Sequence, residues 1–366
     1  MQQVLLIEPF YCGSHKVLID ILNDELRGID DVEVTRMTLP GKKWHWRART
    51  SALFFFQNIP KIKNLKCLFT SCVLPLHELL GLRPDLQSCK KVVYFHENQL
   101  IYPVRKAKER DFQYGYNQIM TCLAADLILF NSNFNRESFL QNIKKFFKLQ
   151  PNYRPTDLRE EIENKCQVLY FPIKLTYNPS VQPETNPDSN VLQIVWPHRW
   201  EFDKNPEMFF RVIYTLVDKG KTNFRLNVLG ESFTGNPPVF EEARIKLLSF
   251  IKNFGYISEK AQYYRILHGS DIVISTADHE FFGVSMLEGV EYQCFPLAPN
   301  NLVYPEIFAF EKCLYKSEED LVNKLESYID NPSVFAADKA QFFDQFSMQR
   351  FDLETLRPKY IDAILQ

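Results

Sequence analysis

The chain has 366 residues, which at the usual ~150 residues per domain corresponds to about two domains with room for a sizeable core. Apolar residues make up 45% and charged residues 24% of the chain, which excludes collagen, low-complexity repeats and a fully disordered protein. The 43 Lys and Arg against 45 Asp and Glu leave a net charge of −2, so the total charge selects no polyanionic partner.

Cysteine usage and the N-terminus bear on where the protein works. The eight cysteines form no C-x-x-C motif in a chain long enough to fold without disulfides, which favours free thiols in a reducing compartment. The first residues, MQQVLLIEPF, lack a basic region and a full apolar core, and no segment reaches 18 consecutive apolar residues. We therefore expect no signal peptide and no membrane span. The expected location is the cytoplasm, with the nucleus as a second location.

Short apolar runs alternate with segments of helical period along the whole chain. Strands are expected at 3–7, 32–38, 66–73, 91–95, 126–131 and 167–171, and in a second series at 191–196, 224–229, 271–276, 293–297 and 312–315. Helices are expected at 15–27, 112–123, 133–148, 205–219, 238–252, 260–268, 284–291, 318–330 and 352–365. The alternation predicts an α/β protein with two Rossmann-like domains, each built on a mainly parallel sheet.

A proline-rich polar stretch separates the two series of strands. It carries Pro179, Pro183 and Pro187 and few apolar residues, which is typical of a linker. We expect an N-terminal domain at 1–175, a linker at 176–190 and a C-terminal domain at 191–345. The last segment, 346–366, is expected to be a helix that packs back on the N-terminal domain.

Charge divides at the same boundary. Residues 1–174 hold 25 Lys and Arg against 18 Asp and Glu, a net charge of +7, and the rest of the chain carries −9. The segment 34–77 contains eight cations and no carboxylate. This run is either a solvated face or a surface for a polyanion.

Several common motifs are absent from the chain. No two glycines are separated by a single residue, so the dinucleotide fingerprint G-x-G-x-x-G does not occur. His77, His96 and His279 are each followed by Glu, but none continues to H-E-x-x-H, and no H-x-E precedes a C-x-x-C. We therefore predict no metal site from the sequence.

The most informative segment runs from the strand at 271–276 into the helix at 284–291. A polar turn with Glu280 ends at Gly283, where the free N–H groups of the helix begin, and Glu288 follows inside the helix. Ligands of open α/β sheets bind at this carboxyl edge. In the alternative interpretation, Glu280 only caps the helix and Glu288 is a solvated helix residue, and neither binds a ligand.

A second loop carries a pair of cations. Arg199 and Lys204 follow the first strand of the second series, where an Arg fork and a Lys point charge suit a diphosphate. Alternatively, both are surface cations neutralised by Glu201 and Asp203. The next strand ends beside them at Gly230 and Glu231.

Three segments of the N-terminal domain are candidates for a ligand-binding site. Two follow strands, with Gly13, Ser14 and His15 in one loop and His96, Glu97, Asn98 and Gln99 in the other. The third interleaves cations and aromatic rings, which suits unstacked RNA bases and phosphates: Lys42, Lys43, Trp44, His45, Trp46, Arg47 and Arg49. Its alternative is an amphipathic loop that packs its indoles on the core, and a lone His96 is also typical of a strand end.

These residues together resemble a known family. Arg199, Lys204 and the Glu280-x₇-Glu288 pair in the second of two Rossmann-like halves look like a retaining family 4 glycosyltransferase. That resemblance implies the GT-B fold, with two facing domains and a crevice between them. The strings KKWHWRARTSAL, YFHENQLIYP, RDFQYGYNQI, WPHRWEFDKNPE, HEFFGVSMLE and LVYPEIF narrow the resemblance to the glycosyltransferase-like domain-containing protein 1 family, the tRNA-queuosine α-mannosyltransferases.

Two positions depart from the expected pattern. Phe281 stands where the wider family has a glycine after its first carboxylate, and Cys12 stands where a second glycine is expected before Gly13.

The resemblance implies roles for these side chains. GDP-mannose would bind the C-terminal domain, with Glu288 on the ribose, Arg199 and Lys204 on the diphosphate and Glu280 on the mannose. The remaining implied donor contacts are Gly230, Glu231, His279, Phe281, Phe282, Gly283 and Val284. The acceptor would be the cyclopentenediol of queuosine at the wobble position of tRNA-Asp, bound by the three N-terminal segments.

The implied mechanism is a front-face displacement with retention. The leaving phosphate oxygen would accept the proton of the acceptor hydroxyl, with Glu280, Arg199, Lys204 and His96 as the catalytic set. No metal, cofactor, membrane or obligate protein partner is implied. Other readings stay open: a family 4 enzyme with another nucleotide sugar or acceptor, a non-catalytic nucleotide-sugar or RNA-binding module, and a hydrolase with Glu280 and Glu288 as its carboxyl pair.

Overall fold

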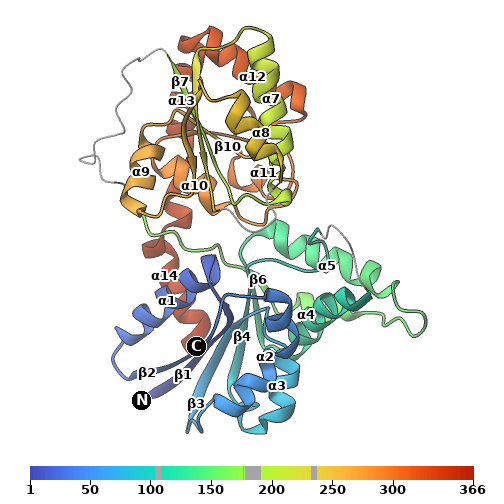
Figure 1. Ribbon diagram of the computed structural model, residues 1–366. Helices are drawn as coiled ribbons and strands as arrows, with labels where there is room; N and C mark the ends of the chain where they lie inside the picture. Colours follow the sequence, from blue (N-terminus) through green and yellow to red (C-terminus); the bar gives the residue numbers. More distant parts are fainter. Residues whose placement is uncertain (104–108, 176, 178–190, 232–236) are drawn as a thin grey trace. The chain divides into compact units, whose positions relative to one another are not determined.

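The computed structural model describes residues 1–103, 109–175, 177, 191–231 and 237–366, which form two compact units (Figure 1). Unit 1 comprises Met1–Lys174 and Phe351–Gln366, and unit 2 comprises Leu175–Arg350. The segment predicted as a linker, 176–190, lies outside the described residues except for Tyr177.

Unit 1 is built on one six-stranded sheet in the order β2-β1-β3-β4-β5-β6. All its strand pairs are parallel. The strands are β1 (Gln2–Tyr11), β2 (Val32–Pro40), β3 (Leu65–Ser71), β4 (Lys90–Phe95), β5 (Leu127–Phe130) and β6 (Cys166–Val168). The predicted parallel sheet is confirmed. Its central strands are apolar because helices cover both faces, which leaves no solvated side.

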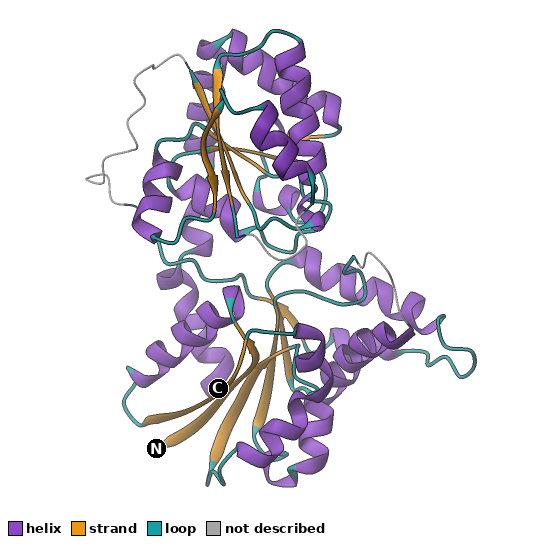
Figure 2. Ribbon diagram, in the orientation of Figure 1, coloured by secondary structure: helices purple, strands orange, loops and turns teal. Residues whose placement is uncertain are grey.

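Helices flank this sheet on both sides (Figure 2). They are α1 (Gly13–Arg27), α2 (Trp44–Asn58), α3 (Leu76–Leu82), α4 (Phe112–Ala124), α5 (Asn133–Phe147), α6 (Leu158–Glu163) and α14 (Leu353–Leu365). In α1, the apolar residues Leu18, Leu22 and Leu26 recur with the helical period and are buried. This face holds α1 on the sheet, so the turn before it is fixed at the carboxyl end of β1.

The C-terminal helix α14 belongs to unit 1, where it packs on β3 and β4. Ile173 N–H donates to Phe351 O at 2.8 Å, and the Tyr360 hydroxyl donates to Tyr170 O at 2.9 Å. The end of the chain is thereby tied to the segment after β6.

Unit 2 has its own parallel sheet in the order β12-β11-β10-β7-β8-β9. The strands are β7 (Leu192–Pro197), β8 (Phe224–Leu229), β9 (Ile251–Gly255), β10 (Ile272–Ile274), β11 (Phe295–Pro299) and β12 (Leu314–Tyr315). The helices are α7 (Pro206–Asp218), α8 (Val239–Lys246), α9 (Lys260–His268), α10 (Val284–Glu291), α11 (Tyr304–Ile307), α12 (Glu318–Asp330) and α13 (Pro332–Gln345).

A glycine sets how closely α10 approaches the sheet of unit 2. A Cβ on Gly289 would lie 2.9 Å from three side-chain carbons of Val273 in β10. Because only a residue without a Cβ fits there, α10 rests directly on the strand that precedes it. The turn at 275–283 is held between these two packed elements.

The structure differs from the sequence prediction in several elements. The helix predicted at 238–252 ends at Lys246, and the residues after it turn and form β9, which pairs with β8. The helices α2, α3, α6, α11 and α13 were not predicted. The segment 44–49, treated as a loop in one interpretation, is the start of α2. Among the described residues, no helix is long and apolar enough to cross a membrane.

Candidate functional site

The strand order of unit 2 reverses between β7 and β10. From β7 the chain proceeds to β8 and β9 on one side, and from β10 to β11 and β12 on the other. Parallel sheets bind ligands beyond the carboxyl ends of the strands at such a point. The loop after β7 holds Lys204, and the loop after β10 holds Glu280, so both predicted residues lie at this switch point.

Lys204 connects the two loops. Its Nζ donates to Glu280 Oε2 at 3.1 Å and to His279 O at 3.0 Å, and it lies 3.2 Å from Asp203 Oδ2. The side chain is only 9% exposed. A buried ammonium flanked by two carboxylates is electrostatically compensated, whereas an isolated one would be strongly penalised.

The Glu280 carboxylate is held in one orientation. Its Oε1 accepts from the amides of Phe281 at 3.0 Å and Phe282 at 3.3 Å, while Oε2 faces Lys204. Burial by itself raises the pKa of Glu280, but the Lys204 charge and the Phe282 amide outweigh burial and lower the pKa to about 2. Glu280 is therefore an ionised hydrogen-bond acceptor near neutral pH.

The turn after Glu280 explains how α10 begins. Gly283 adopts a left-handed conformation with φ 81° as the N-cap of α10. Phe281 and Phe282 are buried, and the Phe281 ring meets the His279 ring edge-on at 4.5 Å. Phe281 therefore places its side chain in the core while its amide remains available to the Glu280 carboxylate.

Glu288 lies one and a half turns into α10. Its Oε2 accepts from the Tyr263 hydroxyl at 3.1 Å, and Oε1 lies 3.7 Å from Lys260 Nζ, so both partners come from α9. Burial raises the pKa of Glu288, and Lys260 opposes that rise. The side chain is 18% exposed, so Glu288 is not a solvated helix residue, as the alternative interpretation had it.

Three further predicted residues lie in the loops after β7 and β8: Arg199, Gly230 and Glu231. Arg199 is half exposed and pairs with Glu201 at 3.3 Å. Gly230 lies against the loop after β7, because a Cβ there would lie 1.8 Å from His198 O. Trp200 N–H donates to Glu231 O at 3.0 Å, which joins the ends of β7 and β8.

Sequence reasoning missed His198, which also lies at the switch point. Its Nε2 donates to Ile274 O at 3.1 Å, and Ser285 Oγ approaches its Nδ1 at 3.4 Å. Burial and the Lys204 charge lower its pKa to about 4, so the ring is neutral near pH 7. The sequence signal that could have identified His198 is its position directly after a buried strand, in the same loop as Arg199.

In unit 1 the strand order reverses between β1 and β3. His15, in the first turn of α1, lies with Nδ1 3.3 Å from Glu8 Oε2 and Nε2 3.2 Å from Glu97 Oε2. Its ring packs on His96 with 4.0 Å between centroids. The structure thus brings the two predicted loops together and adds Glu8, which directly follows the strand predicted at 3–7 and was not among the predicted site residues.

These groups respond differently to burial. Burial by itself lowers the pKa of His15, but Glu8 and Glu97 outweigh it and hold the pKa well above its usual value. Burial and the nearby His15 lower the pKa of His96. The cluster therefore attracts a positive charge between Glu8 and Glu97.

The other predicted acceptor residues have diverse surroundings. Gly13 is exposed, with φ 51°, and a Cβ on it would meet nothing within 4 Å. Cys12 fits before it because Gly41 has no side chain: a Cβ on Gly41 would lie 2.3 Å from the Cys12 Cβ. Asn98 is fully buried and donates to Asn135 Oδ1 at 2.9 Å and Ser138 Oγ at 3.1 Å. We therefore infer that Asn98 holds its loop in place and does not contact a ligand.

The basic and aromatic stretch begins just before α2 and continues into its first half. Lys43, with φ 54°, is the N-cap, and the Trp44 ring packs edge-on against Tyr114 at 5.1 Å. Trp46 is 52% exposed, and the Arg49 guanidinium lies 4.7 Å from its ring centroid. One indole is thus packed, as in the structural interpretation, and the other is presented to solvent with cations around it.

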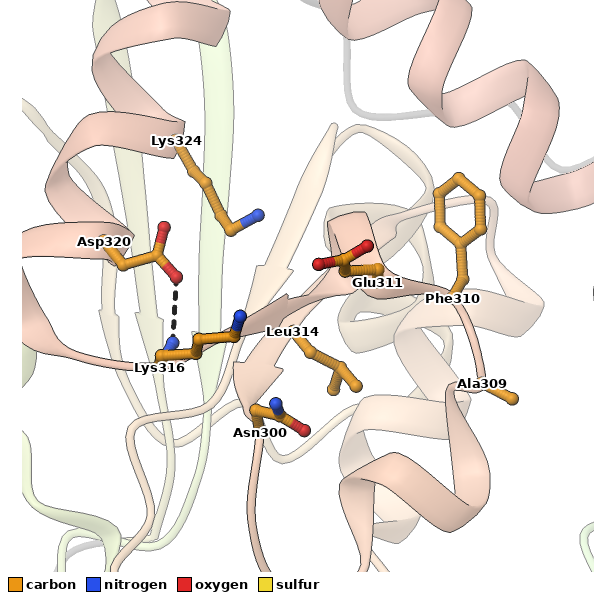
Figure 3. A pocket seen from close by; sticks show the side chains of 8 residues that line it. All are labelled: Asn300, Ala309, Phe310, Glu311, Leu314, Lys316, Asp320 and Lys324. Atoms are coloured by element: carbon orange, nitrogen blue, oxygen red, sulfur yellow. Dashed lines mark hydrogen bonds between the residues drawn. The ribbon is translucent and has the colours of Figure 1, made fainter.

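A separate hollow of about 630 Å³ lies at the β12 edge of unit 2 (Figure 3). Its lining includes Lys316, Asp320 and Lys324, and Lys316 N–H donates to Asp320 Oδ2 at 2.9 Å. None of the predicted donor residues lines it. The hollow therefore belongs to the edge of the sheet and not to the switch point.

Comparison with known proteins decides the family. Residues 3–173 match the family model described as the N-terminal region of tRNA-queuosine alpha-mannosyltransferase, and residues 179–343 match that of group 1 glycosyl transferases. The tRNA-queuosine alpha-mannosyltransferase of Drosophila melanogaster is 49% identical over 365 residues, covering 98% of this chain and 95% of the relative. The chain belongs to the tRNA-queuosine α-mannosyltransferase family. The predicted family and its glycosyltransferase function are confirmed.

Solved structures confirm the GT-B fold predicted for this α-mannosyltransferase family member. Sucrose-phosphate synthase from Thermosynechococcus elongatus has a TM-score of 0.71 at 12% identity, covering 99% of this chain and 98% of that one. A glycosyltransferase from Rickettsia africae has a TM-score of 0.61 at 18% identity, with 99% and 98% covered. At these identities the likeness concerns the fold alone.

Proposed function

We propose that this chain transfers a mannosyl group from GDP-mannose to the cyclopentenediol of queuosine at the wobble position of tRNA-Asp. Family membership supports the mannosyl group and the queuosine acceptor. The observation that carries the site is the buried Lys204–Glu280 pair at the switch point of unit 2.

In this proposal unit 2 binds the donor. Lys204 and Arg199 bind the diphosphate, Glu280 accepts hydrogen bonds from the mannose hydroxyls, and Glu288 does so from the ribose. The support for Glu280 is its fixed, ionised carboxylate, held by two amides and an ammonium. The support for Arg199 is its place in the same loop as Lys204 and its half-exposed ion pair with Glu201, because such a pair contributes only about 0–1 kcal/mol and can be exchanged for a phosphate.

The proposed reaction balances without an oxidant or a further reactant. The bond between the anomeric carbon and the leaving phosphate oxygen breaks, and a bond from the same face to the acceptor oxygen forms. The acceptor proton passes to the leaving phosphate oxygen, and GDP departs. Lys204 and Arg199 stabilise the charge that develops on the diphosphate, and each fixed donor of this kind contributes about 3 kcal/mol when aimed at that charge.

Unit 1 binds the acceptor in this proposal. Exposed Trp46 with Arg47, Arg49, Lys42 and Lys43 offers stacking and phosphate contacts to an anticodon loop. The loops with Gly13, Ser14, His15, His96, Glu97 and Gln99 bind the modified base. Support comes from the exposure of Gly13 and from the partial exposure of Glu97, whose side chain is 17% exposed.

The test uses tRNA-Asp with either queuosine or guanosine at the wobble position. Purified protein is incubated with GDP-mannose, and nucleosides are analysed by mass spectrometry. We expect a hexose on queuosine and none on guanosine, with UDP-glucose and UDP-galactose inactive as donors. Equal labelling of both tRNAs would refute the queuosine acceptor, and faster transfer from a uridine nucleotide would refute GDP-mannose.

Variants test the donor residues in the same assay. We expect Glu280→Gln and Lys204→Met to lose transfer while they remain folded. The matched control is Glu241→Gln, an exposed residue of α8. Transfer by Glu280→Gln at the rate of the control would remove Glu280 from the site.

A further inference from the structure

A second basic segment of unit 1 lies at the end of α5. Residues 138–156 contain no carboxylate and four cations, all of them exposed: Lys144, Lys145, Lys148 and Arg154. On either side of this segment, Arg136 and Arg159 each pair with Glu163. Among the described residues, no carboxylate forms an ion pair with the four cations inside it. Their charge is therefore available to an outside partner.

The side chains around these cations separate a packed face from an open one. Phe146 and Phe147 are buried, so the last turn of α5 is fixed on unit 1. Leu149 and Tyr153, in the loop that follows, are 70% and 84% exposed. This loop extends away from the rest of the unit (Figure 1). The lysines therefore stand at a packed helix end that is open to solvent.

The first turn of α4 joins the end of α5 to the start of α2. On one side, the Phe112 ring stacks on Phe146 of α5 with 4.6 Å between centroids and 11° between planes. On the other side, Tyr114 packs edge-on against Trp44 of α2 at 5.1 Å, and the Arg49 guanidinium lies 6.0 Å from the Tyr114 ring centroid. The two basic segments of unit 1 thus adjoin the same helix end.

A glycine sets how closely α5 approaches α4. A Cβ on Gly115 would lie 2.6 Å from Phe146 Cε2 and 2.8 Å from Leu100 Cδ2. Because a side chain there would push α5 outward, the contact between the two helices depends on the missing Cβ. The spacing between the α5 lysines and the cations of α2 is therefore fixed by packing.

The two segments differ in the ligand that they suit. The start of α2 presents the exposed Trp46 ring among its cations, and an aromatic face stacks on unpaired bases. The end of α5 presents three lysines, whose ammonium groups are point charges that suit phosphates. A paired RNA stem offers phosphates and ribose hydroxyls at regular spacing, while its deep major groove hides the base edges there from side chains.

We propose that Lys144, Lys145 and Lys148, the α5 lysines, bind the phosphate backbone of the paired stem beside the anticodon loop. The start of α2 binds the loop itself. This proposal rests on the proposed function, which makes a tRNA the acceptor. In the competing explanation, the α5 lysines only interact with the negative end of the α5 dipole and are otherwise solvated.

Two RNAs of equal length and charge distinguish these explanations. One is a hairpin of the anticodon stem and loop of tRNA-Asp, transcribed without modification, and the other carries the same loop between flanks that cannot pair. Binding to the full-length protein is measured by fluorescence anisotropy at several salt concentrations. We expect the triple variant Lys144→Ala, Lys145→Ala, Lys148→Ala to bind the hairpin more weakly. Its logarithmic salt slope should fall by about 0.9 for each phosphate that the variant no longer neutralises.

The unpaired strand should lose less affinity in this variant, because its flanks do not hold phosphates at fixed positions. Equal losses for the two RNAs would mean a general attraction of negative charge and would refute the stem contact. Unchanged binding of the hairpin would refute any phosphate contact and leave the α5 lysines solvated.

Two further variants control for charge and for folding. Lys61→Ala, Lys63→Ala, Lys66→Ala removes the same charge from the same unit, at exposed residues near the amino end of β3, and should keep hairpin binding close to that of the wild type. Replacement of the three α5 lysines by Arg should also keep it, because the charge is retained. Thermal unfolding checks that each variant is folded. A loss in the β3 variant as large as that in the α5 variant would overturn the proposal.

The outcome is independent of the chemistry of transfer. The binding experiment uses neither GDP-mannose nor queuosine, so a failure of those parts of the proposed function would leave its result unchanged. Wild-type protein that binds neither RNA would refute the tRNA acceptor, and the stem contact with it. Wild-type protein that binds both RNAs, with a hairpin-specific loss in the α5 variant, would establish the stem contact.

Discussion

At the scale of single residues, the Lys204–Glu280 pair makes the folded state sensitive to acid. The pKa of Glu280 is lowered from 4.5 to about 2, so folding is favoured by the ionised form. This contribution is fully present above the pKa of the unfolded chain, about 4.5, and is lost as the pH falls from there toward about 2. Above pH 5 the pair contributes a constant amount.

We therefore expect Glu280→Gln to be less stable than the wild type near pH 7, with the gap narrowing between about pH 5 and pH 3. The urea midpoint of each protein, measured across that range, provides the comparison. A gap that stays constant as the pH falls would mean that Glu280 titrates normally and that Lys204 does not hold it.

Gly230 supports the same site by close approach of the backbone. Because a Cβ there would lie 1.8 Å from His198 O, Gly230→Ala must displace the loop that carries Arg199 and Lys204. Overpacking of this kind costs about 1–3 kcal/mol, so we expect a lower unfolding midpoint and weaker GDP-mannose binding. The matched control is Gly81→Ala in α3, where a Cβ meets nothing within 4 Å. There alanine should raise stability by about 0.5–1 kcal/mol, and a similar loss in both variants would contradict the steric reason.

Sequence reasoning found residues whose neighbours along the chain reveal their place. Glu280 and Lys204 each follow a buried strand, so the carboxyl edge could be predicted for both. The sequence did not single out Glu8 and His198, because part of what holds their side chains lies 63 or more residues away, at Ser71 for Glu8 and Ile274 for His198. Successive side chains of a strand point to opposite faces, so an error of one residue in a predicted strand end changes whether a side chain is expected in the core or in the site.

At the scale of elements, α2 presents a surface that a loop would not. Ala48, Ala52 and Phe55 are buried on one face, so the helix turns Trp46, Leu53 and Phe54 outward together. The buried face of α2 has only one large apolar residue, Phe55, beside Ala48, Ser51 and Ala52, so the apolar period in the sequence is weak. At β9 the sequence predicted a helix where the structure has a strand, because pairing with β8 overrides the helical period of the preceding segment.

We expect the cations just before α2 and in its first half to bind tRNA phosphates. Replacing Lys42, Lys43, Arg47 and Arg49 by Ala should weaken tRNA binding and reduce its dependence on salt, by about 0.7 to 0.9 in the logarithmic slope for each phosphate that the variant no longer neutralises. The control removes the same number of exposed lysines from unit 2: Lys219, Lys246, Lys312 and Lys316. Equal slopes in both variants would mean that these four cations form a solvated surface and do not bind the tRNA.

Trp46 tests the second half of that interpretation. If its exposed ring stacks on a base, Trp46→Ala should weaken binding by about 1–3 kcal/mol without changing the salt slope. Trp46→Phe should restore part of the binding, because stacking needs only an aromatic face.

At the scale of the whole molecule, the neutral total conceals two oppositely charged units. Unit 1 carries a formal charge of +6 and unit 2 carries −8 once the C-terminal helix is assigned to unit 1. A polyanion such as tRNA is attracted to the first and repelled by the second, whereas in the proposed function the nucleotide sugar depends on a few local cations such as Lys204. The two substrates should therefore respond differently to ionic strength.

We expect the KM for tRNA to rise steeply between about 50 and 200 mM salt and the KM for GDP-mannose to rise only slightly. The reason is counterion release, which scales with the number of phosphates bound: many along an anticodon arm, and two in the donor. Steady-state kinetics at several salt concentrations measures both constants in one preparation. Ultraviolet crosslinking in the same buffers should label peptides from 1–174. Equal salt dependence of the two constants, or crosslinks confined to 191–343, would mean that the charge division does not select where the tRNA binds.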